Sequence, residues 1–86
     1  MNEFKFFRSL QMIFHTFTLG DVEDPEIYAA GPILDWQKSE MGTWVMKHCT
    51  DASFRIAPDF DTYGYQVVIY GNLSDEDATY FTLKYR

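Results

Sequence analysis

At the centre of the chain stand residues 32–48, PILDWQKSEMGTWVMKH, whose large apolar side chains recur at helical spacing. At 100° per residue, one side of such a helix is mainly apolar and the other mainly polar. The first side carries Gln37, Met41, Leu34, Val45, Trp44 and His48, with Cys49 at its margin. The polar side carries Asp35, Ser39, Glu40, Thr43 and Lys47, and Trp36 falls among them. The stretch predicts one main helix that packs on another layer through its apolar side.

The start of this helical region is marked by Asp24-Pro25-Glu26. Asp24 is suited to cap the first amides, and proline is favoured at the first helical position. Gly31-Pro32 then interrupts the pattern, because Pro32 lacks an N–H and disfavours helix at the residue before it. We therefore expect a short turn over 25–30 and the main helix over 32–48.

Alternating stretches on both sides of the helix predict strands at residues 11–19, 53–57, 63–71 and 80–85. In the first strand the alternation puts Phe14 and His15 on opposite faces. Ser74, followed by three acids, predicts one or two helical turns before the last strand. The order indicates an α+β fold: a small antiparallel sheet of three to four strands with one main helix packed across one face.

The length of 86 residues fits a single domain over 1–86, in which the Phe-rich residues 1–10 extend the first strand or form an arm that a partner orders. The single cysteine excludes an internal disulfide. No apolar run approaches 18 residues, so no membrane span is expected, and the N-terminus lacks the pattern of a signal peptide.

The net charge of −6 is unevenly distributed, since residues 21–78 carry twelve acids and only three bases. Affinity for nucleic-acid phosphates comes mostly from Lys and Arg, so direct binding to nucleic acid is disfavoured. Two acidic clusters stand out, and they consist of Asp21, Glu23, Asp24 and Glu26, and of Asp75, Glu76 and Asp77. Helix capping explains both, and the spacing of the first lacks the glycine and the distant glutamate of a Ca²⁺ loop.

The motifs of common enzyme classes do not occur in the chain: it has no phosphate-binding glycine loop, HExxH, CxxC or GxSxG. His48 and Cys49 are neighbours whose side chains diverge on a helix, so they do not form a nucleophile–base pair. We therefore expect no catalytic residue, no cofactor and no metal ion.

Aromatic residues make up 19% of the chain and exceed what one helix on a small sheet can cover. Trp36 on the polar side of the helix needs a cover, which is either Phe4, Phe6 and Phe7 of the arm or another protein. Tyr70 and Tyr80 are predicted on the sheet face opposite the helix. Because Trp and Tyr are common anchors at interfaces, we predict that Trp36, Tyr70 and Tyr80 bind a partner together with the two acidic clusters.

Two segments resemble small uncharacterised proteins of tailed bacteriophages. The likeness rests on residues 20–49, which contain DVEDPxxY, PxxxWQxSExGxWVM and the glycine before them, and on the YGY strand within 63–85. It covers about sixty residues and implies a viral origin, without implying a biochemical activity.

The function predicted from these features is a non-enzymatic protein–protein interaction module of phage origin, an acidic inhibitor or modulator of a host protein in the bacterial cytoplasm. The alternative is a small structural or accessory subunit of the virion, and a third reading is a small metal-dependent hydrolase. The expected partner is another protein, either a host factor or a virion component, or further copies of the chain.

Overall fold

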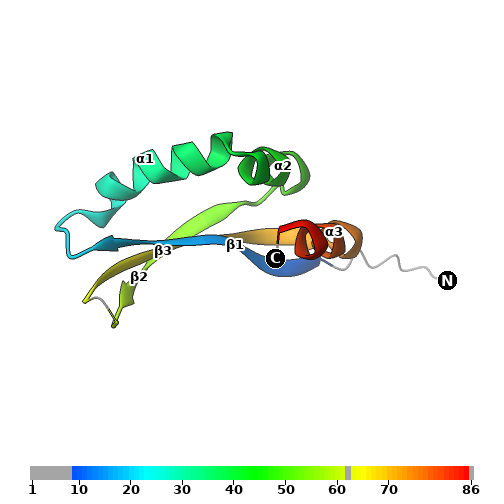
Figure 1. Cartoon of the computed structure of the whole chain (residues 1–86). Helices are drawn as coiled ribbons and strands as arrows, with labels where there is room; N and C mark the ends of the chain where they lie inside the picture. The colour runs from blue at the N-terminus through cyan, green and yellow to red at the C-terminus, as the bar shows by residue number, and fades with distance from the viewer. Residues whose placement is uncertain (1–8, 62, 86) are drawn as a thin grey trace.

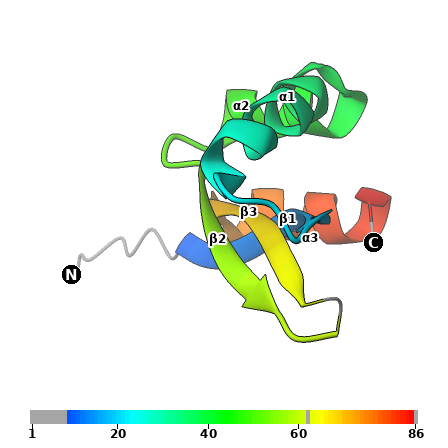
Figure 2. The ribbon, with the colours of Figure 1, turned by 90° about the vertical axis from the view of Figure 1, so that its left-hand side faces the viewer.

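A three-stranded antiparallel sheet with helices over one face and at one end forms the chain (Figures 1 and 2). A computed structural model describes residues 9–61 and 63–85. The elements, in order, are β1 (Ser9–Gly20), α1 (Pro25–Lys38), α2 (Glu40–His48), β2 (Ser53–Asp59), β3 (Gly64–Ser74) and α3 (Asp75–Tyr85). The predicted α+β class and antiparallel sheet are confirmed. Of the predicted arm, residues 1–8 lie outside the described residues, and Ser9 and Leu10 begin β1.

The centre of the sheet is β3, which pairs with β1 on one side and β2 on the other. Its run Val67-Val68-Ile69 is buried, and because consecutive side chains of a strand point to opposite faces, both faces of the sheet are covered at this point. Three of the predicted strands are confirmed. The strand β1 extends past the prediction at both ends, while β2 and β3 extend past it only at their C-terminal ends and β3 begins one residue later than predicted.

A β-bulge in β1 changes which side chains face the helices. The pairing register shifts between Ile13 and His15, so that Phe14 is an extra residue in the ladder. As a result the consecutive rings of Phe14 and His15 both contact Trp36, at centroid distances of 6.4 and 6.2 Å. The prediction that Phe14 and His15 lie on opposite faces is therefore wrong.

Two helices, α1 and α2, replace the single helix predicted over 32–48, and they meet at Ser39. The Ser39 backbone is extended (φ −70°, ψ 168°), its hydroxyl donates to the Trp36 carbonyl at 2.5 Å, and its Oγ accepts from the Gly42 N–H at 3.0 Å. Ser39 thus ends α1 and caps α2. The helix α1 runs through Pro32, where an exposed face lets water replace the lost hydrogen bond.

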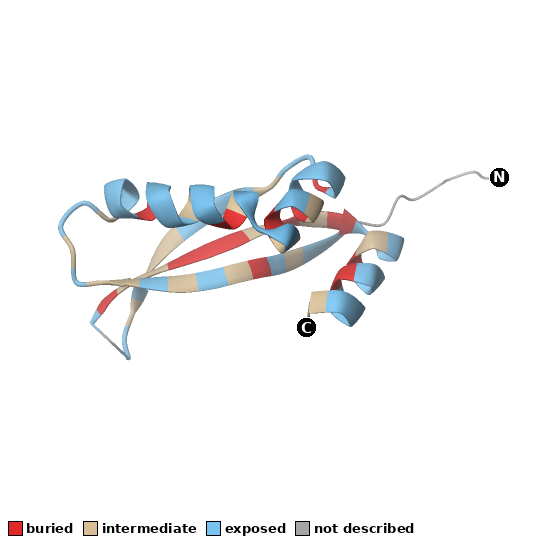
Figure 3. Cartoon of the chain, turned by 45° about the horizontal axis from the view of Figure 1, so that its top comes forward, coloured by how far each residue is buried: buried red, intermediate tan, exposed pale blue. Residues whose placement is uncertain are grey.

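The break at Ser39 gives each helix its own buried stripe. In α1 the stripe is Ala29, Ile33 and Trp36, which are spaced i, i+4, i+7 on one face, with Ala29 and Trp36 buried and Ile33 half-buried. Figure 3 shows that the rest of the α1 surface is mainly exposed. Because a single helical wheel over 32–48 mixes the two stripes, it placed Leu34 inside and Trp36 outside. In the structure Leu34 is 54% exposed and Trp36 only 7% exposed.

The C-terminal segment is helix α3, and the strand predicted at 80–85 is wrong. Ser74 Oγ accepts a hydrogen bond from the Asp77 N–H at 3.1 Å, so the predicted helix start is confirmed, but the helix continues to Tyr85. Ala78, Phe81 and Tyr85 form a stripe at i, i+3, i+7 that packs on the core. None of the helices within residues 9–61 and 63–85 is long and apolar enough to cross a membrane.

Candidate functional site

One end of the molecule carries six carboxylates on two segments, residues 21–26 and residues 59–61. The pairing of Gly20 with Tyr65 and of Asp59 with Gly64 puts the start of the β1–α1 connection at the base of the β2–β3 hairpin, so that both segments lie at the same end of the sheet (Figure 1). We call this the acidic end, and it consists of Asp21, Glu23, Asp24, Glu26, Asp59 and Asp61. Neither residues 20–28 nor residues 59–64 contain a Lys or Arg. The loops therefore present a uniformly negative surface.

Two highly exposed aromatic residues, Phe60 and Tyr63, lie in the hairpin of the acidic end. They are 82% and 85% exposed. Tyr63 has φ 59°, a left-handed backbone conformation that a bulky residue rarely adopts. Asp59 Oδ1 accepts from the Asp61 N–H at 3.1 Å and shapes the turn between them. The pattern DFDTYG, in which turn-forming acids and a glycine flank two aromatics, is the signal from which the sequence analysis could have identified Phe60 and Tyr63.

The second acidic cluster, Asp75 to Asp77, lies at the other end of the molecule. The eleven residues of β3 separate it from the acidic end, which at ~3.3 Å per residue is roughly 33 Å. Its acids occupy the first turn of α3, where they oppose the positive end of the helix dipole. Asp77 also lies 3.4 Å from His48 Nδ1. The two predicted acidic clusters therefore do not form one surface.

The three predicted aromatic anchors lie in three different places. Trp36 is buried between β1 and α2, and its Nε1–H donates to Met41 Sδ at 3.4 Å, so its expected position on the polar side of the helix is wrong. Tyr70 is half-buried on the sheet face opposite Ile69, beneath the Arg55 guanidinium at 5.3 Å. Tyr80 is 44% exposed on α3 and stacks on Trp44 at 5.2 Å, so its predicted position on the sheet is also wrong.

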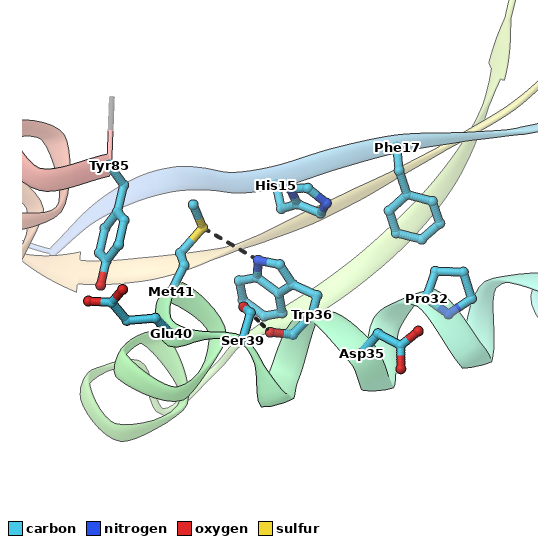
Figure 4. Close-up of a pocket in the computed structure, with 9 residues that line it drawn as sticks. All are labelled: His15, Phe17, Pro32, Asp35, Trp36, Ser39, Glu40, Met41 and Tyr85. Atoms are coloured by element: carbon cyan, nitrogen blue, oxygen red, sulfur yellow. Dashed lines mark hydrogen bonds between the residues drawn. The ribbon is translucent and has the colours of Figure 1, made fainter.

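A cleft of about 670 Å³ lies between β1 and the two helices α1 and α2 (Figure 4). His15 and Phe17 line it from β1, and Trp36 lines it from α1. The rim residues are Pro32, Asp35, Ser39, Glu40, Met41 and Tyr85. Alternation along β1 already puts His15 and Phe17 on one face. The Phe14 bulge adds the Phe14 ring to the same side, which no strictly alternating pattern could have predicted.

The charged groups at the cleft rim differ in their partners. Glu40 Oε2 lies 3.1 Å from Lys84 Nζ, and this contact raises the pKa of Lys84. Lys84 Nζ also lies 5.7 Å from the Tyr85 ring. The side-chain carboxylate of Asp35, in contrast, makes no hydrogen bond or ion pair with the residues that the structure describes.

The side chains of Cys49 and His48 point to different partners. The buried Cys49 thiol donates to Asp51 Oδ1 at 3.2 Å, and burial raises its pKa, which keeps it in the unreactive thiol form. The His48 ring stacks on Trp44 with centroids 4.3 Å apart. The geometry thus separates the His48 imidazole from the thiol, so that the two do not form a nucleophile–base pair.

Neither a metal-ion site nor a match to a known protein assigns a chemistry to this arrangement. Within residues 9–61 and 63–85, no three His, Cys, Asp or Glu side chains lie in a group that could hold a metal ion. No protein-family model, curated protein or solved structure matches the chain.

Proposed function

We propose that the chain is a non-enzymatic protein-binding module that presents its acidic end to a basic surface of another protein. The observation that carries the proposal is the acidic end itself, in which six carboxylates and the exposed rings of Phe60 and Tyr63 lie at the same end of the sheet. Rings of this size gain free energy when a partner removes them from water. The acidic end therefore combines an apolar anchor with a charge that selects a basic partner.

The two parts of this surface have different roles in binding. A negative field of this kind speeds the encounter with a basic surface and weakens as salt is added. Once the partner has arrived, buried aromatic anchors slow its dissociation. The second predicted cluster is not part of this surface, because Asp75, Glu76 and Asp77 lie in the first turn of α3.

The partner we propose is a host protein in the bacterial cytoplasm that the module inhibits or modulates. Support comes from the resemblance of residues 20–49 and 63–85 to phage-encoded proteins. A basic groove that normally holds nucleic acid is a suitable target, because the carboxylates of the acidic end can take the place of phosphates. Mass spectrometry of purified virions separates this proposal from the alternative of a virion subunit, which requires the chain in the particle.

The proposal is tested by capture from a bacterial lysate, followed by calorimetry with the purified captured protein. The variant D59N/D61N removes two charges from the acidic end while each asparagine can still support the turn. The matched control D75N/E76Q removes the same charge roughly 33 Å away. We expect about tenfold weaker binding for D59N/D61N and a change below about twofold for the control.

Two outcomes would overturn the proposal. If both double variants weaken binding equally, the effect is one of net charge and the acidic end is not the contact surface. If the affinity of the unaltered chain is the same at low and high salt, charge does not select the partner. Circular dichroism of both variants establishes that each is folded at the temperature of the measurement.

A further inference from the structure

We propose that the cleft between β1 and α1–α2 binds an arginine side chain of the partner protein. This inference rests on the proposed function for the nature of the partner, but it concerns a different surface. The cleft opens beside α1, and Figure 4 shows His15 and Phe17 pointing into it from β1, opposite Trp36, Asp35 and Pro32 of α1. Its volume of about 670 Å³ accommodates a side chain together with part of the segment that carries it.

The aromatic lining is the first reason for a cation. Phe17, His15 and Trp36 form a continuous series of rings, in which His15 lies 5.9 Å from Phe17 and 6.2 Å from Trp36. Ring faces attract cations, and the planar guanidinium of arginine stacks on them more readily than a strongly hydrated ammonium does.

The polar groups of the cleft are the second reason. Both charged residues at the rim, Asp35 and Glu40, are hydrogen-bond acceptors. The indole N–H of Trp36 already donates to Met41, and the hydroxyl of Ser39 already donates to the Trp36 carbonyl. The two carboxylates would therefore repel an anion, and these two donors are already hydrogen-bonded within the chain. A cation, in contrast, is attracted by the negative charge of the carboxylates.

The chain already carries out such recognition with its own Lys84. Lys84 pairs with Glu40 and lies near the rings of Tyr80 and Tyr85, at 5.8 and 5.7 Å. This contact occupies the carboxylate at one end of the cleft. Asp35 at the other end has no such partner among the described residues, and it can form a two-point contact with a guanidinium beside the Phe17 ring.

The test uses calorimetry with a five-residue peptide, acetyl-Ala-Ala-Arg-Ala-Ala-amide, and the full chain. The same peptide with citrulline keeps the shape of arginine without its charge. We expect binding of the arginine peptide, about tenfold weaker binding of the citrulline peptide, and a similar loss for D35N and F17L. The control E76Q removes the same charge in the first turn of α3, outside both the cleft and the acidic end, and should leave peptide binding within about twofold.

The proposal is overturned if the arginine peptide does not bind, if the citrulline peptide binds equally well, or if E76Q weakens binding as much as D35N does. If the arginine peptide does not bind, the proposed function can still be tested, because D59N/D61N measures partner binding at the acidic end independently of the cleft. Conversely, loss of the acidic end as a contact surface does not alter the peptide result.

Discussion

Asp51 accepts hydrogen bonds from Asn72 with both of its carboxylate oxygens. Oδ1 accepts from the backbone N–H of Asn72 at 2.9 Å, and Oδ2 accepts from its side-chain Nδ2 at 2.7 Å. The thiol of Cys49 also donates to Oδ1. This contact joins the α2–β2 connection to the central strand β3, and it fixes the position from which β2 begins.

The hydrogen bonds to Asp51 predict how stability changes in acid. The side-chain and backbone donors of Asn72 lower the pKa of Asp51 from 3.8 to about 2. Because the folded-state pKa is lower than the unfolded value, the stabilisation is complete above the unfolded pKa and is lost as pH falls through the folded one. In thermal denaturation followed by circular dichroism, D51N should melt below the unaltered chain at neutral pH.

The difference in melting temperature should narrow between about pH 4 and pH 2 and then disappear. D21N, which removes an exposed carboxylate of the acidic end, is the control and should show no such narrowing. A melting difference for D51N that stays constant down to pH 2 would contradict the role assigned to these hydrogen bonds.

The helical state of α3 predicts opposite effects for two threonines. Thr82 is exposed on α3, where alanine is the better helix former, so T82A should raise the free energy of unfolding by roughly 0.5 kcal/mol. Thr16 is exposed on strand β1, where threonine is favoured, so T16A should lower it. Urea denaturation measures both. If T82A is destabilising to the same degree as T16A, residues 80–85 are a strand after all.

The buried position of Trp36 can be checked by fluorescence, because the chain has only two tryptophans. W44F leaves Trp36 as the sole emitter, packed against Phe14 and Met41. Its emission should lie at shorter wavelength than in the unfolded chain, and acrylamide should quench it weakly. In the reciprocal variant W36F, the half-buried Trp44 should be quenched more strongly. Quenching of Trp36 as in the unfolded chain would restore it as an exposed anchor.

The close approach of α1 and α2 at Gly42 predicts a large effect for one glycine of this region and a small effect for another. A Cβ at Gly42 would overlap the backbone carbonyl oxygen of Trp36 and lie 2.7 Å from its carbonyl carbon. G42A should therefore cost roughly 1–3 kcal/mol of folding free energy. A Cβ at Gly31 meets nothing within 4 Å beyond its chain neighbours, and the gain in helix propensity is opposed by the restriction that Pro32 places on a residue with a Cβ before it, so G31A should change the free energy of unfolding by less than about 0.5 kcal/mol. Urea denaturation distinguishes them, and equal effects would mean that α1 and α2 do not meet closely at Gly42.

Part of the fold could be predicted from short sequence patterns alone. The strands β2 and β3 follow from alternating or continuous apolar residues, and the start of α3 follows from Ser74 and its acids. The break at Ser39 also has a local signal, a serine cap with Glu40 in the first turn and Gly42 close behind, but a helical wheel drawn over 32–48 conceals it. Tertiary packing decided the rest of α3, since Phe81 and Tyr85 fit a helix at i, i+4 as well as an alternating strand.

The candidate sites depend on long-range features that no local pattern contains. The acidic end exists because the sheet register puts Gly20, from which residues 21–26 continue, at the base of the hairpin that carries Asp59 and Asp61. The cleft exists because the fold brings His15 of β1 against Trp36 of α1, and the Phe14 bulge adds a further ring to the same side. Composition could therefore predict an acidic, aromatic-rich surface, but it could not predict which acids and which rings share it.

The strained backbone of Tyr63 predicts that stability and partner binding change in opposite directions. A left-handed conformation costs a residue with a Cβ roughly 1–2 kcal/mol, and glycine avoids this cost while losing roughly 0.5–1 kcal/mol of chain entropy. Y63G should therefore raise the free energy of unfolding by up to about 1 kcal/mol and weaken binding of the captured partner, because it removes an exposed ring.

F60S, which removes the neighbouring ring at an ordinary backbone position, should change the free energy of unfolding by less than about 0.5 kcal/mol and also weaken binding. Urea denaturation and calorimetry on both variants check the two effects separately. A destabilised Y63G would mean that the ring contributes to the fold, and unchanged binding by both variants would remove the hairpin aromatics from the contact surface.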